Sequence, residues 1–395
     1  MPTPAPQHAV FSLPRSSAAT VPQAPPGKIE FFHTHIAPHA SERVAQVLHS
    51  TWVGEGPVVR HFEQELARWG LAHPVAVNSC TAALHLSLLA AGVGPGDEVI
   101  LPPQTFIATG MAVLAAGARP VFADIDPRTA NLDPDDLPRR ITPRTRAVIV
   151  VHWGGLPARL DRIAQVAREH NLVVIEDAAH AFGARYHGRP IGSISPFTCF
   201  SFQAIKHFTC GDGGVVCCPD PELAAAVRRR RWFGIDRENV RRNRYGGREL
   251  AVSEPGLKYH MNDIAAAVGL ANLEAFAPRL KRRQQIGQWY RQQLASVPGV
   301  ELLHLPPECQ HAYWLFPLLV EDRDGFVEKL AQHGIPTSMV DTRIDTNPVF
   351  GQTPQQREQL QGQARFEARQ IHIPLHDALS DEQVEYILRV IASGW

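Results

Sequence analysis

One lysine, Lys206, lies between a strand-like segment and a glycine-rich turn, within residues 200–216. If the fold buries it there, the pKa of its ammonium falls because the charged form loses its hydration. A neutral amine can condense with an aldehyde cofactor and form a Schiff base. Lysines beside glycine clusters are more often surface residues. Taken alone, this stretch therefore gives a candidate nucleophile and nothing more.

A second candidate lies at the end of the apolar run 173–175, where Glu176 and Asp177 form an acidic pair. A carboxylate at the end of a buried strand is costly unless it meets a cation. The protonated ring nitrogen of pyridoxal phosphate is such a cation, and a carboxylate beside it makes the ring a better electron sink. Asp177 is the candidate for that role. Its alternative role is to cap a helix that begins at Ala178.

A third stretch joins a short apolar run at 75–77 to a small polar turn and a helix with an apolar face. The backbone N–H groups at a helix N-terminus bind phosphate well, and neighbouring hydroxyl groups can add to them. Ser79, Cys80 and Thr81 are therefore predicted to form a phosphate cradle. The alternative is an ordinary helix N-cap.

The three stretches belong to a chain in which apolar runs alternate with helical patterns. The runs predicted to form buried strands are 75–77, 98–101, 120–123, 147–151 and 172–175. This alternation predicts an α/β fold with a mainly parallel sheet. Ligands of such sheets lie beyond the carboxyl ends of the strands, so polar residues that follow these runs are the first candidates for chemistry.

The pattern divides the chain into three parts. Residues 1–28 are rich in Pro, Ala and Ser and are predicted to be a disordered leader. Residues 29–278 are predicted to form a large α/β domain, and residues 279–395 a smaller α+β domain. The last helix of the smaller domain is expected to begin at Ser380, which has the pattern of a capping box.

Composition narrows the classes of partner. The 39 basic and 39 acidic side chains cancel, so the net charge gives no argument for nucleic acid or for a membrane surface. No apolar run approaches the roughly 20 residues of a membrane span. The six cysteines show no paired CxxC spacing and His33 and His35 lack further ligands, so we assign no metal and expect a reducing cytoplasm. The expected partner is a small molecule.

Together the three stretches resemble, in order and spacing, the DegT/DnrJ-type nucleotide-sugar aminotransferase family. The resemblance covers nearly all of the chain from about residue 29 onward. It implies the aspartate aminotransferase fold (fold type I), with a large domain built on a seven-stranded type of sheet, and it implies pyridoxal phosphate as the cofactor. Lys206 would form the Schiff base and then move the proton between cofactor and substrate.

The resemblance also implies roles for three further residues. Ser201, five residues before the lysine, would join the phosphate cradle. Phe106 matches the aromatic residue that stacks on the cofactor ring, although core packing is the usual role of a phenylalanine. His180 stands where many relatives have glutamine, and either side chain could bond near the phenolic oxygen of the cofactor.

Active sites of the family are shared across a homodimer, so a segment of one subunit reaches the phosphate of the other. Lys258 and His260 occupy the places where relatives often have Asn and Arg, and the sequence leaves open which of them meets the phosphate. Gly54 and Gly56 resemble the glycine-rich segment beside the sugar-nucleotide site, where they would permit close backbone approach. Arg231 is the candidate contact to the nucleotide diphosphate, although a short basic run is usually a solvated helix face.

The resemblance implies transfer of an amino group from an amino acid, L-glutamate, to a keto-sugar nucleotide, in amino-sugar synthesis for a surface polysaccharide or a secondary metabolite. A PLP aminotransferase of a cyclitol or another non-nucleotide ketone, and a PLP-dependent sugar dehydratase, are alternatives within the fold. A non-catalytic PLP-binding sensor is an alternative from another class, against which Lys206 and Asp177 argue. A Rossmann-type dehydrogenase would need a GxGxxG turn after an early strand, and the sequence has none.

Overall fold

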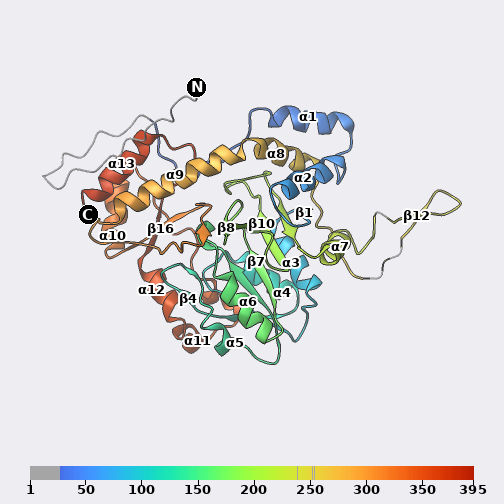
Figure 1. Ribbon diagram of the computed structural model, residues 1–395, viewed down its shortest axis with the longest axis horizontal. Coiled ribbons are helices and arrows are strands. Elements are labelled where there is room, and N and C mark those ends of the chain that lie inside the picture. The colour runs from blue at the N-terminus through green and yellow to red at the C-terminus, as the bar shows by residue number, and fades with distance from the viewer. Residues whose placement is uncertain (1–26, 238, 251, 253) are drawn as a thin grey trace, which may run out of the picture.

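A computed structural model describes residues 27–237, 239–250, 252 and 254–395 of the chain (Figure 1). The predicted leader at 1–28 therefore lies outside the described residues, apart from its last two positions. Figure 1 shows helices packed around a central sheet, with a second group of helices and strands beside it that contains the C-terminus.

The central sheet has seven strands in the order β1-β11-β10-β7-β6-β2-β3. Neighbouring strands pair in parallel except for β11, which is antiparallel to both β1 and β10. The strands are β1 (Val75–Val77), β2 (Glu98–Leu101), β3 (Arg119–Phe122), β6 (Thr145–Val151), β7 (Val173–Asp177), β10 (Phe197–Ser201) and β11 (Gly214–Cys217). This arrangement confirms the mainly parallel sheet, and the five predicted strands agree to within two residues at each end.

Each face of the sheet is buried, which explains why its strands are continuous apolar runs. Alternate side chains of a strand point to opposite faces. In β6, Val148 and Val150 join one apolar core while Ala147 and Ile149 join another. Both cores are covered by helices, as a parallel sheet requires.

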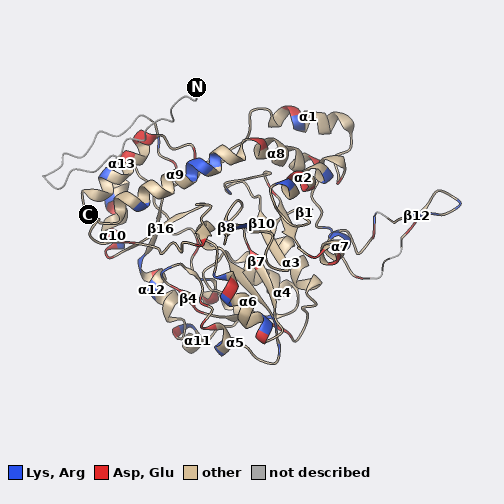
Figure 2. Cartoon of the chain, viewed as in Figure 1, with Lys and Arg blue, Asp and Glu red and all other residues tan. Residues whose placement is uncertain are grey.

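Helices of the larger part cover these two faces. The core on one face includes residues of α3 (Cys80–Ala90), α4 (Ala108–Ala115) and α7 (Pro221–Arg230). The core on the other face includes residues of α2 (Pro57–Arg68), α6 (Leu160–Glu169) and α8 (Asp263–Glu274). Helix α1 (Ala40–Ser50) packs against α8. Figure 2 shows charges of both signs on outer helices such as α1, α2 and α6, and few on the central strands.

Short elements connect the main ones. They are β4 (Ile125–Asp126), β5 (Asn131–Leu132), α5 (Leu137–Arg140), η1 (Trp153–Gly155), β8 (Arg185–Tyr186), β9 (Arg189–Pro190) and β15 (Cys309–Gln310). Strands β12 (Arg241–Arg242) and β13 (Arg248–Glu249) form a hairpin that projects from the body of the molecule in Figure 1.

The C-terminal part is built on an antiparallel sheet in the order β14-β16-β17, with bounds Val300–Leu302, Phe316–Val320 and Gln370–Ile373. Its apolar core includes residues of α9 (Phe276–Leu294), α10 (Arg323–Gln332) and α13 (Asp381–Ala392). Shorter helices follow β16 and α10: η2 (Ile344–Thr346), η3 (Pro348–Phe350), α11 (Pro354–Glu358) and α12 (Gln361–Arg369).

Two sequence features of this C-terminal part can be compared with its structure. The predicted capping box is present, because the Ser380 side chain accepts from the backbone N–H of Gln383 and the Gln383 side chain accepts from that of Ser380. Helix α9 runs without a break through the proposed domain boundary at residues 278 and 279, and Ile29 packs into the C-terminal core. The boundary therefore stays a prediction.

Candidate active site

Lys206 lies in the loop between β10 and β11, beyond the carboxyl end of the sheet. Its backbone N–H donates to the carbonyl of Gln203 at 2.9 Å, and its Nζ lies 3.6 Å from the centre of the Trp314 ring. Burial among protein atoms lowers the pKa of the Lys206 ammonium to about 8, although Asp341 and Asp177 raise it in part. At neutral pH about a tenth of this amine is uncharged. A surface lysine would be almost fully protonated, so the environment prepares Lys206 for attack on an aldehyde.

Asp177 ends β7 and is only 5% exposed. Its Oδ2 accepts from the Thr109 hydroxyl at 2.8 Å, and its Oδ1 accepts from the Ala179 backbone N–H at 3.1 Å. The second bond resembles a cap, but residues 179 and 180 form a turn rather than a helix. Burial raises the pKa of Asp177. A cation placed beside it would stabilise its ionised form, as expected for a residue that pairs with a protonated ring nitrogen.

The proposed phosphate cradle lies at the start of α3. Ser79 is the N-cap, and its hydroxyl accepts from the Ala82 N–H at 3.1 Å. The amides of Cys80 and Thr81 head the helix, at positions that have no acceptor within it. Ser79 is thus a helix N-cap, which was the alternative predicted for this stretch. The backbone N–H groups of Cys80 and Thr81 remain available to an anion.

Ser201 is brought to the same place by the register of the sheet. It ends β10 and is the register partner of Gly214 in β11. A Cβ at Gly214 would lie 2.6 Å from the carbonyl carbon of Ser79 and 2.7 Å from the amide nitrogen of Cys80. Glycine at 214 therefore allows β11 to approach the start of α3, and this approach places Ser201 near the proposed cradle.

The two rings assigned to the cofactor differ in their surroundings. Phe106, just before α4, is 58% exposed, so core packing does not occupy it and its ring is available to a ligand. His180 is buried and stacks on Trp314 with the ring centres 3.8 Å apart. Burial holds the pKa of His180 well below its usual value, and among the described residues its Nδ1 has no hydrogen-bond partner. A buried, unpaired ring nitrogen beside Lys206 is suited to a polar atom of a ligand.

Lys258 and His260 lie beside β1, next to the start of α3. Lys258 is exposed, and its backbone bridges to that of Trp232. His260 bridges to Val77, its ring packs edge-on against Trp232 at 4.2 Å, and burial lowers its pKa.

An open cavity of about 580 Å³ lies on this side of the molecule, lined by Asn78, Ser79, Cys210, Asp212, Met261, Asn262, Ile264, Ala265 and Val268. The predicted contact to a second subunit stays a prediction.

The proposed substrate glycines have different environments. No heavy atom lies within 4 Å of a Cβ built on Gly54, so its surroundings are open. A Cβ on Gly56 would lie 2.5 Å from Asp263 Oδ2, and the Asp263 carboxylate accepts from the N–H groups of Gly56 and Val59 at 2.8 and 3.0 Å. Glycine at 56 therefore allows the close approach of Asp263 of α8, which caps the start of α2, and of the Trp52 ring.

Arg231 is buried, with 3% of its surface exposed. Its guanidinium donates to Glu63 and Glu55, each at 2.6 Å, and to the Ala76 carbonyl at 2.7 Å. Burial alone would raise the pKa of Glu63, but Arg231 and Arg228 outweigh it and hold that pKa below its usual value. These contacts support a structural role for Arg231, and the proposed contact to the diphosphate stays a prediction.

The two roles of Arg231 lead to different outcomes for Arg231→Met. We expect the free energy of unfolding in urea to fall by about 3 kcal/mol, because the change removes the most buried cation beside Glu63 and Glu55. Adding Glu63→Gln should recover part of the loss. Unchanged stability together with weaker binding of a nucleotide-linked substrate would instead support the substrate role.

A loop of the C-terminal part, residues 341–348, lies near Lys206. Its first residue, Asp341, interacts electrostatically with Lys206, and burial raises the pKa of Asp341 to about 6. Gln104 Nε2 donates to the Asp341 carbonyl at 2.9 Å and so ties the loop to the segment before α4.

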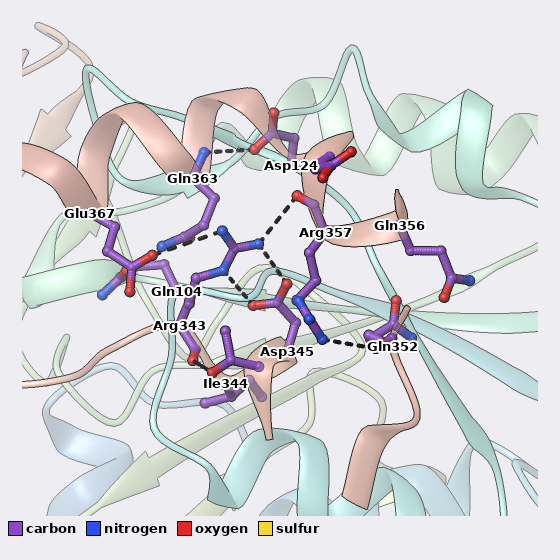
Figure 3. A network of polar contacts seen from close by, with 12 residues as sticks. Gln104, Asp124, Arg343, Ile344, Asp345, Gln352, Gln356, Arg357, Gln363 and Glu367 are labelled. Atoms are coloured by element: carbon purple, nitrogen blue, oxygen red, sulfur yellow. Dashed lines mark hydrogen bonds and ion pairs between the residues drawn. The ribbon is translucent and has the colours of Figure 1, made fainter. Parts of the chain in front are cut away.

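The network in Figure 3 holds this loop in place. Arg343 donates to both oxygens of Asp345, at 2.7 and 2.6 Å, and Gln363 Nε2 donates to Gln104 Oε1 at 2.9 Å. The Asp124 carboxylate accepts from the Gln363 N–H at 2.8 Å. These bonds fix the position of Asp341 relative to the central sheet.

Three residues of the site were not singled out from the sequence: Thr109, Trp314 and Asp341. The pairing of Thr109 with Asp177 and of Trp314 with Lys206 depends on tertiary contacts. For Thr109 and Trp314, the sequence offers a hydroxyl at the second residue of α4 and an aromatic residue before a buried strand. Neither signal points to a partner.

Within the described ranges, no group of three or more His, Cys, Asp or Glu side chains could hold a metal ion. No described helix is both long enough and apolar enough to cross a membrane. The groups around Lys206 are those that an aldehyde cofactor with a phosphate and a ring nitrogen would use: an amine, a carboxylate, a helix N-terminus and an unpaired imidazole nitrogen.

Comparisons with known proteins agree with this geometry. Residues 35–392 match the DegT/DnrJ/EryC1/StrS aminotransferase family. The spore coat polysaccharide biosynthesis protein SpsC of Bacillus subtilis is 37% identical over 362 residues, which cover 89% of this chain and 92% of SpsC.

Solved structures are similar over nearly the whole chain. The sugar aminotransferase CalS13 from Micromonospora echinospora has a TM-score of 0.87 and 37% identity, and the match covers 93% of this chain and all of CalS13. Spr1654 from Streptococcus pneumoniae, solved in its PLP form, has a TM-score of 0.85 and 29% identity, and the match covers 93% and 99% of the two chains.

Proposed function

The chain belongs to the DegT/DnrJ/EryC1/StrS aminotransferase family, and we propose that it moves an amino group from L-glutamate to the keto group of a nucleotide-linked sugar. It is a pyridoxal phosphate-dependent sugar aminotransferase of fold type I. The observation that carries the proposal is the placement of Lys206, an amine with a lowered pKa, among residues that fit this cofactor. The name of SpsC supports a role in polysaccharide synthesis, and the alternative product is a secondary metabolite.

When bound, the cofactor supplies an electron sink that stabilises the negative charge left by proton removal. The residues of the chain do the rest. Lys206 would hold the cofactor through its amine and would carry the proton to and from the substrate carbon. Asp177 would favour the protonated ring nitrogen. The start of α3 and Ser201 would bind the phosphate, and Phe106 and His180 would orient the ring.

We propose a homodimer in which Lys258 is the residue that reaches the phosphate of the other subunit. Lys258 is exposed, whereas His260 is half-buried, its ring is packed against Trp232 and burial lowers its pKa. The cytoplasm is the proposed compartment, which agrees with the six free thiols of the chain.

The first experiment tests the reaction with the amino donor. Purified holoenzyme is mixed with L-glutamate, and the absorption of the cofactor is followed as it changes from the aldehyde form to the amine form. We expect conversion together with release of 2-oxoglutarate in equal amount. A spectrum that no amino acid changes would reject the aminotransferase and favour a sensor.

The second experiment tests the acceptor. The amine form of the enzyme is offered keto-sugars linked to UDP, GDP or dTDP, and a keto-cyclitol as the matched non-nucleotide ketone. Mass spectrometry should find an aminated sugar nucleotide. Amination of the cyclitol alone would move the substrate to the non-nucleotide class, and loss of water without amination would identify a dehydratase.

A further inference from the structure

Trp314, just before β16, contacts the segment of Lys206 at two points. Its indole N–H donates to the carbonyl of Ile205 at 3.1 Å. The Nζ of Lys206 lies 3.6 Å from the centre of the ring. One side chain from the C-terminal part of the chain therefore holds both the peptide from which the lysine projects and the amine at its end.

The indole is itself held in place. Trp314 is only 2% exposed. The ring of His180 stacks on it at 3.8 Å, with an angle of 28° between the planes, and Phe32 stacks on it at 5.6 Å. Trp153 packs edge-on against His180 at 5.4 Å. A ring fixed on several sides provides a platform with a defined position for the amine.

The face of an indole attracts an ammonium because its π electrons carry negative charge, and the attraction grows where water is excluded. At Lys206 this attraction opposes the effect of burial, which favours the neutral amine. The other titratable groups that interact with Lys206 are Cys80 of α3, Asp177 of β7, His180 and His207 of the neighbouring loops, and Asp341. Asp177 and Asp341 also favour the ammonium. A test of the ring must therefore change Trp314 and leave both carboxylates in place.

We propose that Trp314 is a positioning residue for Lys206: its ring holds the amine whenever the amine is not bonded to the cofactor, and its N–H fixes the preceding peptide. This role rests on the proposed function of Lys206 as the reacting amine. In an aminotransferase the lysine is released in each half-reaction and must return to the same place. A ring that keeps the free amine near the reacting carbon reduces the time and the entropy that this return costs.

The test uses the full-length chain freed of cofactor, so that its readout does not depend on turnover. The protein is acylated over a range of pH with a small amine reagent, and the modified lysines are mapped by mass spectrometry, with exposed Lys281 as the internal reference. We expect Lys206 of the wild type to react with a midpoint near pH 8. In Trp314→Leu the midpoint should fall by about one pH unit.

Two further measurements separate the ring from the N–H group. Trp314→Phe keeps an aromatic face and loses the donor to Ile205, so its midpoint should stay closer to that of the wild type. Hydrogen exchange of the peptide around residues 203–209 should become faster in both variants, because both free the Ile205 carbonyl.

A fluorinated tryptophan at position 314 guards against a variant that fails to fold, since its shape and its N–H are kept while its ring face becomes less negative. The midpoint of Lys206 should then fall stepwise with each added fluorine. A midpoint that stays the same or rises in Trp314→Leu and across the fluorinated series would overturn the proposal. Failure of the proposed function would look different, because reductive trapping of the cofactor would then mark a residue other than Lys206.

Discussion

Replacing Lys206 with alanine should leave a protein that binds pyridoxal phosphate without a reducible link to the chain and that turns over at least roughly 10³-fold more slowly. The size of the loss follows from the two roles of one amine, covalent attachment and proton movement. The side chain is partly buried, and this burial lowers its pKa to about 8. The measurement is borohydride reduction followed by peptide mapping, with turnover measured in parallel.

Lys281→Ala is the matched control, because Lys281 is exposed on α9 and has an ordinary surface environment. It should retain both the trapped cofactor and full turnover. Trapped label that persists in Lys206→Ala would contradict the assignment of the reacting amine.

The rate at which the wild type forms the link should depend on pH, because the link requires the neutral amine. This rate should rise about tenfold per pH unit below pH 8 and level off above it.

Much of the fold could be predicted from the sequence because its local patterns and its tertiary packing agree. Strands such as β6 are apolar along their whole length since both faces of the sheet are covered. A parallel sheet brings the carboxyl ends of its strands to one edge. The stretches around Ser79, Asp177 and Lys206 follow strands of this sheet, so their proximity could be expected before any contact was known.

The remaining contacts could not be predicted because they join segments that are distant in the chain. Thr109 meets Asp177 only when the start of α4 lies near the end of β7, and Trp314 meets Lys206 only when the C-terminal part docks on the central sheet. The basic run that contains Arg231 looked like a solvated helix face. Instead, Arg231 is buried between two carboxylates, which come from the segment before α2 and from α2 itself.

Replacing Asp177 with asparagine should lower turnover by roughly 10²- to 10³-fold while the fold is kept. Asparagine has nearly the same shape and can still accept from Thr109, but it carries no negative charge. The ring nitrogen then loses its proton and the electron sink is weakened. The measurements are single-turnover conversion with glutamate and thermal unfolding. Full activity in this variant would reject the proposed role of Asp177.

Thr109→Val is the matched variant, since it removes a hydrogen bond to Asp177 and keeps the charge. A single such bond corresponds to about tenfold in rate. The hydroxyl of Thr109 lowers the pKa of Asp177, in opposition to the burial that raises it. Without the hydroxyl that pKa should rise further, so the acidic limb of the pH–rate profile should move to higher pH in Thr109→Val. In Asp177→Asn this limb should be absent, because an amide does not titrate. A limb that is unmoved in Thr109→Val and still present in Asp177→Asn would show that another group controls the protonation of the ring.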